Sequence, residues 1–211
     1  MPFDLEKSRR RKSLALVAAG ETAIFALFYS VMLPYPLSGS LYPFYAVLTP
    51  VIIAWMFLSN RDMAGSWLKS LGNPDMFVLF FAILAWMYVF SASHINPYAI
   101  FWEQAFTDEF NFRLFLIPFL GKYVGKERAT VIQSAMFLLY YMGFLFFYPA
   151  GFPGVYYYLF IIDMFSMGVL YGVIYLVRNS IYIDLALHLS LYAMSFVVVS
   201  LGWIPYLFLP S

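Results

Sequence analysis

Long blocks of apolar residues alternate with short polar connections along this chain. A helix of about 20 apolar residues spans the hydrocarbon core of a bilayer, and the blocks have about this length. The short segments of alternating polarity that build a transmembrane barrel are not seen. The pattern therefore predicts an all-α fold, a polytopic membrane helix bundle with about seven transmembrane helices. We expect the spans at residues 14–33, 42–58, 76–92, 105–120, 129–147, 158–177 and 181–202.

The composition points the same way. Charged residues make up 11% of the chain and hydrophobic residues 64%, whereas soluble domains carry about 25% charged residues. We expect a basic cytoplasmic tail at residues 1–12 and a single transmembrane domain at residues 13–211, because no long linker or repeat interrupts the chain. The lipid bilayer is the expected partner, and the basic tail is expected to meet anionic head groups rather than nucleic acid.

Basic residues collect at one set of predicted helix ends. Eleven of the twelve Lys and Arg residues lie there: Lys7, Arg9, Arg10, Arg11, Lys12, Arg61, Lys69, Lys122, Lys126, Arg128 and Arg178. The opposite loops, at residues 34–41, 93–104 and 148–157, contain none. Since basic loops stay on the cytoplasmic side, we predict an integral protein of the cell membrane with its N-terminus in the cytoplasm and its C-terminus outside.

The fourth predicted span holds a dense group of charges. Asp108, Glu109 and Arg113 occur within six residues, among Phe, Leu and Ile. A charge at the bilayer centre costs roughly 3 kcal/mol on insertion scales, so these three have to be paired, hydrated or functional. Glu109 and Arg113 stand four residues apart, which predicts an ion pair on one helix face. Asp108 projects elsewhere, towards a cavity if the group is functional and towards a neighbouring helix if it is structural.

Polar residues also form a stripe on the seventh predicted span. Asp184, His188 and Tyr192 are each four residues apart. A carboxylate one turn from a histidine fixes the tautomer of the imidazole and raises its basicity, which would let Asp184 orient His188. The alternative is a structural histidine. Glu21 in the first span has two similar interpretations, a hydrogen bond to a neighbouring helix or a part in the central polar site.

Metal chemistry has little support in the sequence. The chain has no cysteine, which excludes disulfides, thiolate metal sites and cysteine nucleophiles. Zinc needs three or four ligands, and Asp108, Glu109, Asp184 and His188 supply them only if their helices converge. No His-Glu-x-x-His motif is present. We expect no cofactor; a divalent metal held by Asp108 and His188 is an alternative that no motif supports.

Taken in order, these segments resemble the CPBP family, the CAAX-type and bacteriocin-processing intramembrane proteases also called the Abi family. The resemblance covers roughly residues 100–200. It rests on Asp108-Glu109-Phe-Asn-Phe112-Arg113 for the family's Glu-Glu-x-x-Phe-Arg, Phe137-Leu-Leu-Tyr-Tyr141 for Phe-x-x-x-His, Gly168-Val-Leu-Tyr-Gly172 with Asn179-Ser180-Ile181 for Gly-x-x-x-Gly and Ser-Leu/Ile, and His188-Leu-Ser-Leu-Tyr192 for His-x-x-x-Asn. The two glycines also permit close helix contact.

The differences from the family fall on the residues that the resemblance implies are catalytic. The family's first Glu is thought to activate water, with two His and an Asn completing the site. Here Asp108 replaces that Glu, Tyr141 replaces one His and Tyr192 replaces the Asn. The matching residues are Glu109, Arg113 and His188.

The resemblance then implies a role for each of these residues. Asp108 is the base and His188 the oxyanion or water partner. Glu109 and Arg113 form a positioning pair, and one of the two tyrosines is a donor to an oxyanion.

Two functions follow from this resemblance. One is a divergent intramembrane peptidase with a degenerate Glu/His site, cleaving a membrane-embedded peptide near the outer leaflet. The other is a non-catalytic scaffold or accessory subunit of a membrane protein complex. Because the site residues fall towards the non-cytoplasmic ends of their spans, we expect an outward-opening cavity, which disfavours the processing of cytosolic prenylated proteins. A lipid or small-molecule carrier is a third class, which a tunnel through the bundle would favour.

Overall fold

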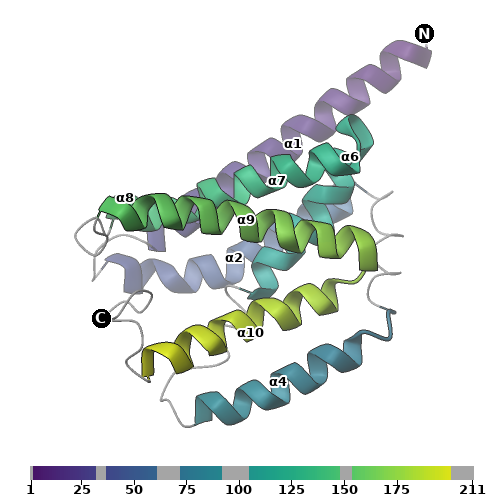
Figure 1. Cartoon of the computed structure of the whole chain (residues 1–211). Coiled ribbons are helices and arrows are strands. Elements are labelled where there is room, and N and C mark those ends of the chain that lie inside the picture. The colour runs from purple at the N-terminus through teal and green to yellow at the C-terminus, as the bar shows by residue number, and fades with distance from the viewer. Residues whose placement is uncertain (1, 32–36, 61–71, 92–104, 148–153, 201–211) are drawn as a thin grey trace.

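The computed structural model describes residues 2–31, 37–60, 72–91, 105–147 and 154–200, and every regular element in these ranges is a helix (Figure 1). The elements are α1 (Pro2–Val31), α2 (Leu37–Ser59), α4 (Met76–Ser91), the π-helix η3 (Glu109–Leu116), α6 (Ile117–Val124), α7 (Lys126–Tyr141), α8 (Gly143–Phe147), α9 (Gly154–Arg178) and α10 (Ile181–Ser200). The predicted all-α fold is thus confirmed for the described residues, and each predicted span coincides with at least one helix.

Two stretches of the described helices are long and apolar enough to cross a membrane. They are Glu6–Ser30 in α1 and Tyr157–Arg178 in α9. Shorter apolar helical stretches are Pro43–Ser59, Met76–Met87 and Ile181–Leu191. The count of seven transmembrane helices therefore stays a prediction.

The basic tail expected at residues 1–12 is helical, because α1 begins at Pro2 and runs without interruption to Val31. Proline is well suited to the first turn of a helix, because its missing N–H has no partner there in any case. Glu6 and Arg10 form an exposed ion pair at 3.1 Å across one turn, which supports the helix by a few tenths of a kcal/mol, roughly 0.2–0.5. The basic residues thus lie on a helical extension of the first predicted span.

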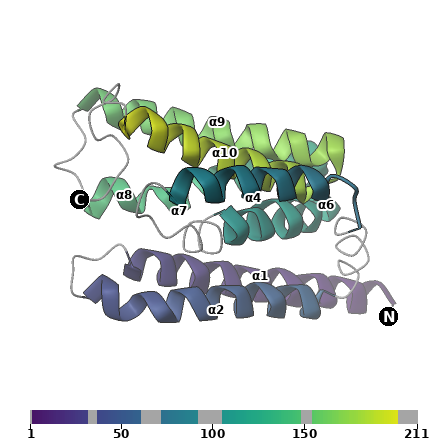
Figure 2. The same cartoon turned by 90° about the horizontal axis from the view of Figure 1, so that it is seen from below.

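The helices pack around a central one. Helix α1 packs on α2, α4 on α10, and α7 on α9. Figure 2 shows α1 and α2 on one side of the molecule and α4, α9 and α10 on the other, with α6 and α7 between them. The π-helix η3 contacts α2, α6, α7, α9 and α10. It is therefore the element on which the two sides of the bundle meet.

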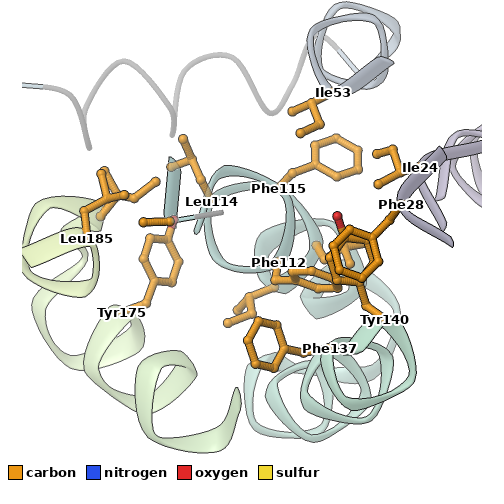
Figure 3. Close-up of a cluster of buried hydrophobic side chains, with 14 of the residues drawn as sticks. Ile24, Phe28, Ile53, Phe112, Leu114, Phe115, Phe137, Tyr140, Tyr175 and Leu185 are labelled. Atoms are coloured by element: carbon orange, nitrogen blue, oxygen red, sulfur yellow. The ribbon is translucent and has the colours of Figure 1, made fainter. Parts of the chain in front are cut away.

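Apolar side chains leave this central helix in several directions (Figure 3). Phe112 meets Phe137 of α7 edge-on, with ring centroids 5.3 Å apart. Phe115 meets Phe57 of α2 at 4.9 Å, while Leu114 points towards α9 and α10. Seven of the eight residues of η3 are buried. A helix that is apolar all round belongs in the interior, and this helix carries its charges there too.

The α7–α9 contact is close because of two glycines. A Cβ added to Gly168 would lie 2.9 Å from the Cα of Ser134, and one added to Gly172 would lie 2.6 Å from Cγ2 of Thr130. Gln133 strengthens the contact, because its Nε2 donates to the carbonyl oxygen of Gly168 at 2.8 Å. The close helix contact predicted from Gly-x-x-x-Gly is confirmed.

The helix ends that carry basic residues gather at one end of the bundle (Figure 2). Ser13 of α1 donates a hydrogen bond to the side chain of Asn60, directly after α2. Arg178, the last residue of α9, pairs with Asp75 just before α4 at 3.1 Å. The grouping of basic ends that the sequence predicted therefore has a counterpart in three dimensions.

Gly168→Ala should lower the free energy of unfolding by about 1–3 kcal/mol, the usual cost of adding a methyl group to a packed core. The added Cβ would meet backbone, which cannot rotate out of the way. Gly154→Ala in the same helix is the matched control, since nothing lies within 4 Å of its added Cβ. Thermal unfolding in detergent measures both, and equal melting temperatures would contradict the close contact.

Candidate functional site

Charged and polar side chains from three helices meet beside η3. Asp108 and Glu109 stand at its start and Arg113 follows one turn later, while Tyr141 ends α7 and His188 lies in α10. All five side chains are buried. Nδ1 of His188 lies 2.8 Å from Oε1 of Glu109. The charges of the fourth predicted span and the imidazole of the seventh therefore meet in one buried site, and Glu109 is the residue that connects them.

Glu109 uses both of its oxygens. Oε1 faces His188, and Oε2 lies 3.4 Å from Nε of Arg113. The predicted pair of Glu109 and Arg113 is confirmed, and both side chains are 0% exposed. A carboxylate can only accept a hydrogen bond, so His188 donates from Nδ1. The imidazole is thereby held in the tautomer whose Nε2 carries the lone pair.

Arg113 is held by aromatic rings as well as by Glu109. Its guanidinium carbon lies 4.4 Å from the ring centroid of Phe137 and 5.1 Å from that of Tyr171. Cations are attracted to the faces of aromatic rings, most strongly when they are desolvated. Tyr171 also stacks on the ring of His188 at 5.3 Å. One tyrosine of α9 therefore contacts both the cation and the imidazole.

Asp184 does not have the partner that its spacing suggested. The carboxylate bonded to His188 is Glu109, and neither oxygen of the fully buried Asp184 has a hydrogen-bond partner among the described residues. The stacking on Tyr171 and the bond to Glu109 together fix the imidazole ring of His188. Asp184, one turn away on the same helix, therefore makes no hydrogen bond to it. Asp184 still feels the charges of Glu109 and Arg113, and it belongs to the same cluster of buried charges.

Asp108 faces Tyr141 rather than an open cavity. The hydroxyl of Tyr141 donates to Oδ2 of Asp108, while Oδ1 has no partner within the described residues. The charges of His188 and Arg113 also act on Asp108. The tyrosine at the position of the family's histidine is thus bonded directly to the aspartate at the position of the family's first glutamate.

Glu21 fastens α1 to the same region. Its Oε2 accepts a hydrogen bond of 3.1 Å from Nδ2 of Asn111 in η3. Of its two interpretations, the hydrogen bond to a neighbouring helix is the one found.

The sequence analysis missed Asn111 and Tyr171. Asn111 gave a signal, because it is the only amide in the apolar fourth span. Tyr171 gave none, since its role depends on packing between helices.

Two of the expectations lie outside these contacts. The side chain of Tyr192 is not among the described ones, so its place at the site stays a prediction. Within the described ranges, no three His, Cys, Asp or Glu side chains are grouped as a metal ion would require. Among the described residues, Asp108 and His188 therefore do not belong to a group of three such ligands.

An apolar groove of about 300 Å³ runs beside the start of η3. One wall contains Pro50, Ile53 and Phe57 from α2. The other contains Phe106 and Thr107 just before η3 and Phe110 within it. Thr107 and Phe110 flank the acid pair in sequence. The groove is therefore lined by the two residues that flank the acid pair, while Asp108 and Glu109 themselves are not part of its wall.

Comparison with known families gives a match in this region. The family model described as type II CAAX prenyl endopeptidase Rce1-like matches residues 95–194. This range contains Asp108, Glu109, Arg113, Tyr141, His188 and Tyr192. Comparisons with curated proteins and with solved structures gave no significant match.

Glu109→Gln and Arg113→Met should each lower the free energy of unfolding by about 3–5 kcal/mol, because each leaves one buried charge without its partner. The double variant should lose less than the sum, since neither charge remains.

Glu6→Gln is the control, because it breaks the ion pair of Glu6 with Arg10. This pair has the same spacing, but its side chains are 61% and 66% exposed. Exposed pairs contribute about 0–1 kcal/mol. Unfolding in mixed detergent micelles measures all four variants, and a Glu109→Gln cost as small as that of Glu6→Gln would contradict the role given to the buried pair.

Proposed function

We propose that the chain is a divergent intramembrane endopeptidase of the CPBP family, because residues 95–194 match the Rce1-like family model. The observation that carries the proposal is the hydrogen bond of 2.8 Å between Glu109 and His188, with Asp108 next in sequence. It joins a carboxylate pair and an imidazole inside a buried site, and these are the groups that can activate water by general acid–base catalysis.

In the proposed reaction, Asp108 takes a proton from a water molecule, and the oxygen of that water attacks the carbonyl carbon of the scissile peptide bond. The C–N bond then breaks, and the proton passes to the leaving amine. Nε2 of His188 carries the lone pair while Nδ1 donates to Glu109. Nε2 can therefore accept a hydrogen bond from the attacking water, which supports the role of His188 as the water partner. It can donate to the oxyanion only after it gains a proton.

Tyr141 has a different role in this mechanism from the one expected. Its hydroxyl hydrogen is directed at Asp108, so the hydroxyl orients the base instead of stabilising an oxyanion. Glu109 and Arg113 act through His188, as positioning residues held by the faces of Phe137 and Tyr171.

The substrate proposed for this site is a peptide embedded in the membrane. Counted at about 1.5 Å per residue from the basic end, Tyr141 lies about 22 Å along α7 and His188 about 10 Å along α10. With the N-terminus in the cytoplasm, as the basic ends favour, the site occupies the middle and outer part of a seven-helix bundle. The apolar groove between α2 and Phe106–Phe110 would receive an extended apolar segment from the lipid.

Asp108→Asn and His188→Ala should each reduce peptide cleavage at least about 100-fold, the lower end of what a general acid or base contributes. The assay uses protein reconstituted in liposomes with a library of single-span peptides, and mass spectrometry of the products. Asp163→Asn is the control, an exposed acid in α9, and should cleave normally. Unchanged turnover in both site variants would remove the peptidase proposal.

One observation favours a second function, a non-catalytic scaffold or accessory subunit of a membrane complex. Asp108 is one methylene shorter than the family's glutamate, and Tyr141 occupies it with a hydrogen bond. Displacement of a catalytic group by about 1 Å reduces rates by about 100-fold. Asp108 and Tyr141 both differ from the family's residues and bind each other, which is consistent with a site that stabilises the fold and does not catalyse. The partners of such a scaffold would be other membrane subunits.

The triple variant Asp108→Glu, Tyr141→His and Tyr192→Asn separates the two functions, because it restores the family's residues. If the native chain is a scaffold, the triple variant should cleave peptides in the liposome assay while the native chain gives none. Tyr140→His in place of Tyr141→His is the matched control, since its neighbour Tyr140 bonds to Tyr45 at 2.8 Å and not to Asp108. Strong cleavage by the native chain would exclude the scaffold.

A further inference from the structure

A polar hollow of about 480 Å³ lies at the basic end of the bundle, and neither acid of the pair Asp108 and Glu109 lines it. It is bounded by the first turns of α1, the end of α2 and the end of α6. Arg9, Arg10 and Lys12 line it from α1, and Lys122 lines it from α6. Two segments that are distant in sequence therefore bring basic side chains to one hollow, and the end of α2 adds the polar side chains of Ser59 and Asn60.

The charge of this hollow selects an anion. Among the described residues, its lining has four cationic side chains and one acid, Glu6, so these residues together carry a net charge of +3. Glu6 is bound by Arg10 at 3.1 Å, so these two charges offset each other. A compact group with one or two negative charges would find both Arg and Lys donors here, and such donors bind phosphate well.

The hollow also has an apolar side. Leu16 of α1 and Phe119 and Tyr123 of α6 line it next to the basic residues. The ring of Phe119 stacks on Phe115 of η3 at 5.6 Å, so this wall is continuous with the core of the bundle. A ligand that fits both walls has a phosphate at one end and hydrocarbon at the other.

The position of the hollow suits a membrane lipid. It lies where the apolar part of α1 gives way to its charged first turns, and Figure 1 shows those turns extending past α6. In the proposed membrane arrangement this is the level of the cytoplasmic head groups, where anionic lipids attract basic residues. A long, partly charged helix beside a lipid-facing bundle thus forms one wall of the hollow.

We propose that this hollow is a binding site for the phosphate head group of an anionic phospholipid, with its acyl chain against Leu16 and Tyr123. The proposal does not depend on whether the buried carboxylates are catalytic. It assigns the helical N-terminus a specific task, since the first turns of α1 supply three of the four cations of the site.

The experiment compares two pairs of substitutions that remove the same charge. Arg9→Gln with Lys122→Gln removes two cations that line the hollow, and Arg11→Gln with Lys126→Gln removes neighbours from the same end that do not. Native mass spectrometry of the protein in detergent measures binding of added phosphatidylglycerol, with phosphatidylcholine as the neutral-lipid comparison. Each basic residue near a head group changes lipid affinity about fivefold, so two change it about 25-fold.

We expect the first pair to weaken phosphatidylglycerol binding by about 25-fold and the second pair by less than about threefold. Equal losses in both pairs would reduce the effect to general surface charge and overturn the site, as would unchanged binding in the first pair. Inorganic phosphate distinguishes a lipid site from a site for a soluble phosphate. Millimolar phosphate that displaces the lipid would overturn the lipid assignment, while retention of the lipid supports it.

A folding defect is separated from a binding defect by one further measurement. Arg9 and Lys122 are exposed, so the first pair should unfold at the same temperature as the native chain in detergent without added lipid. Added phosphatidylglycerol should raise the melting temperature of the native chain, because a ligand that binds the folded state stabilises it. The same rise in the first pair would contradict the proposal.

Discussion

The contact of Glu109 with both Arg113 and His188 is the interaction on which the rest of the bundle depends. A charged group without partners is too costly to bury in a helical core, and η3 together with Asp108 directly before it buries three charged side chains. Glu109 joins the guanidinium of its own helix to the imidazole of α10, and Tyr141 of α7 binds the remaining acid. These contacts require α7, α9 and α10 to surround η3, and the apolar side chains of η3 then complete the core around them (Figure 3).

Aromatic rings adapt this arrangement to a low-dielectric interior. Phe137 and Tyr171 present their faces to the guanidinium of Arg113, whose nitrogens have no hydrogen bond among the described residues. Ring faces offer a delocalised negative potential and do not add another charge to bury. Among the described residues, neither oxygen of Asp184 in the same cluster has a hydrogen-bond partner. The cluster thus keeps the three acids Asp108, Glu109 and Asp184 close to the guanidinium of Arg113, a concentration of buried charge that is typical of functional sites.

Sequence patterns predicted what one helix determines by itself and missed what two helices determine together. The helical blocks, the pair of Glu109 and Arg113 and the close contact at Gly168 all follow from spacing along one chain segment. The partner of His188 did not, because spacing within α10 suggests Asp184 while packing selects Glu109 from another helix. The π-helical winding of η3 was not foreseen either, since it is rare and depends on the groups around it. The resemblance to the family drew attention to Asp108 and Tyr141, but only the fold shows that the two side chains are bonded to each other.

The placement of these charges has a consequence for how the chain is made. In the proposed membrane arrangement, η3 would leave the translocation machinery with Asp108, Glu109 and Arg113 already synthesised and His188 still 79 residues away from Glu109. At about 5–20 residues per second, that delay lasts roughly 4 to 16 seconds. During this interval three side chains that lipid tails reject, at roughly 3 kcal/mol each, have no partner from α10. We therefore expect η3 to stay in contact with water or a chaperone after its synthesis, and to insert fully into the bilayer only after α10 has been made.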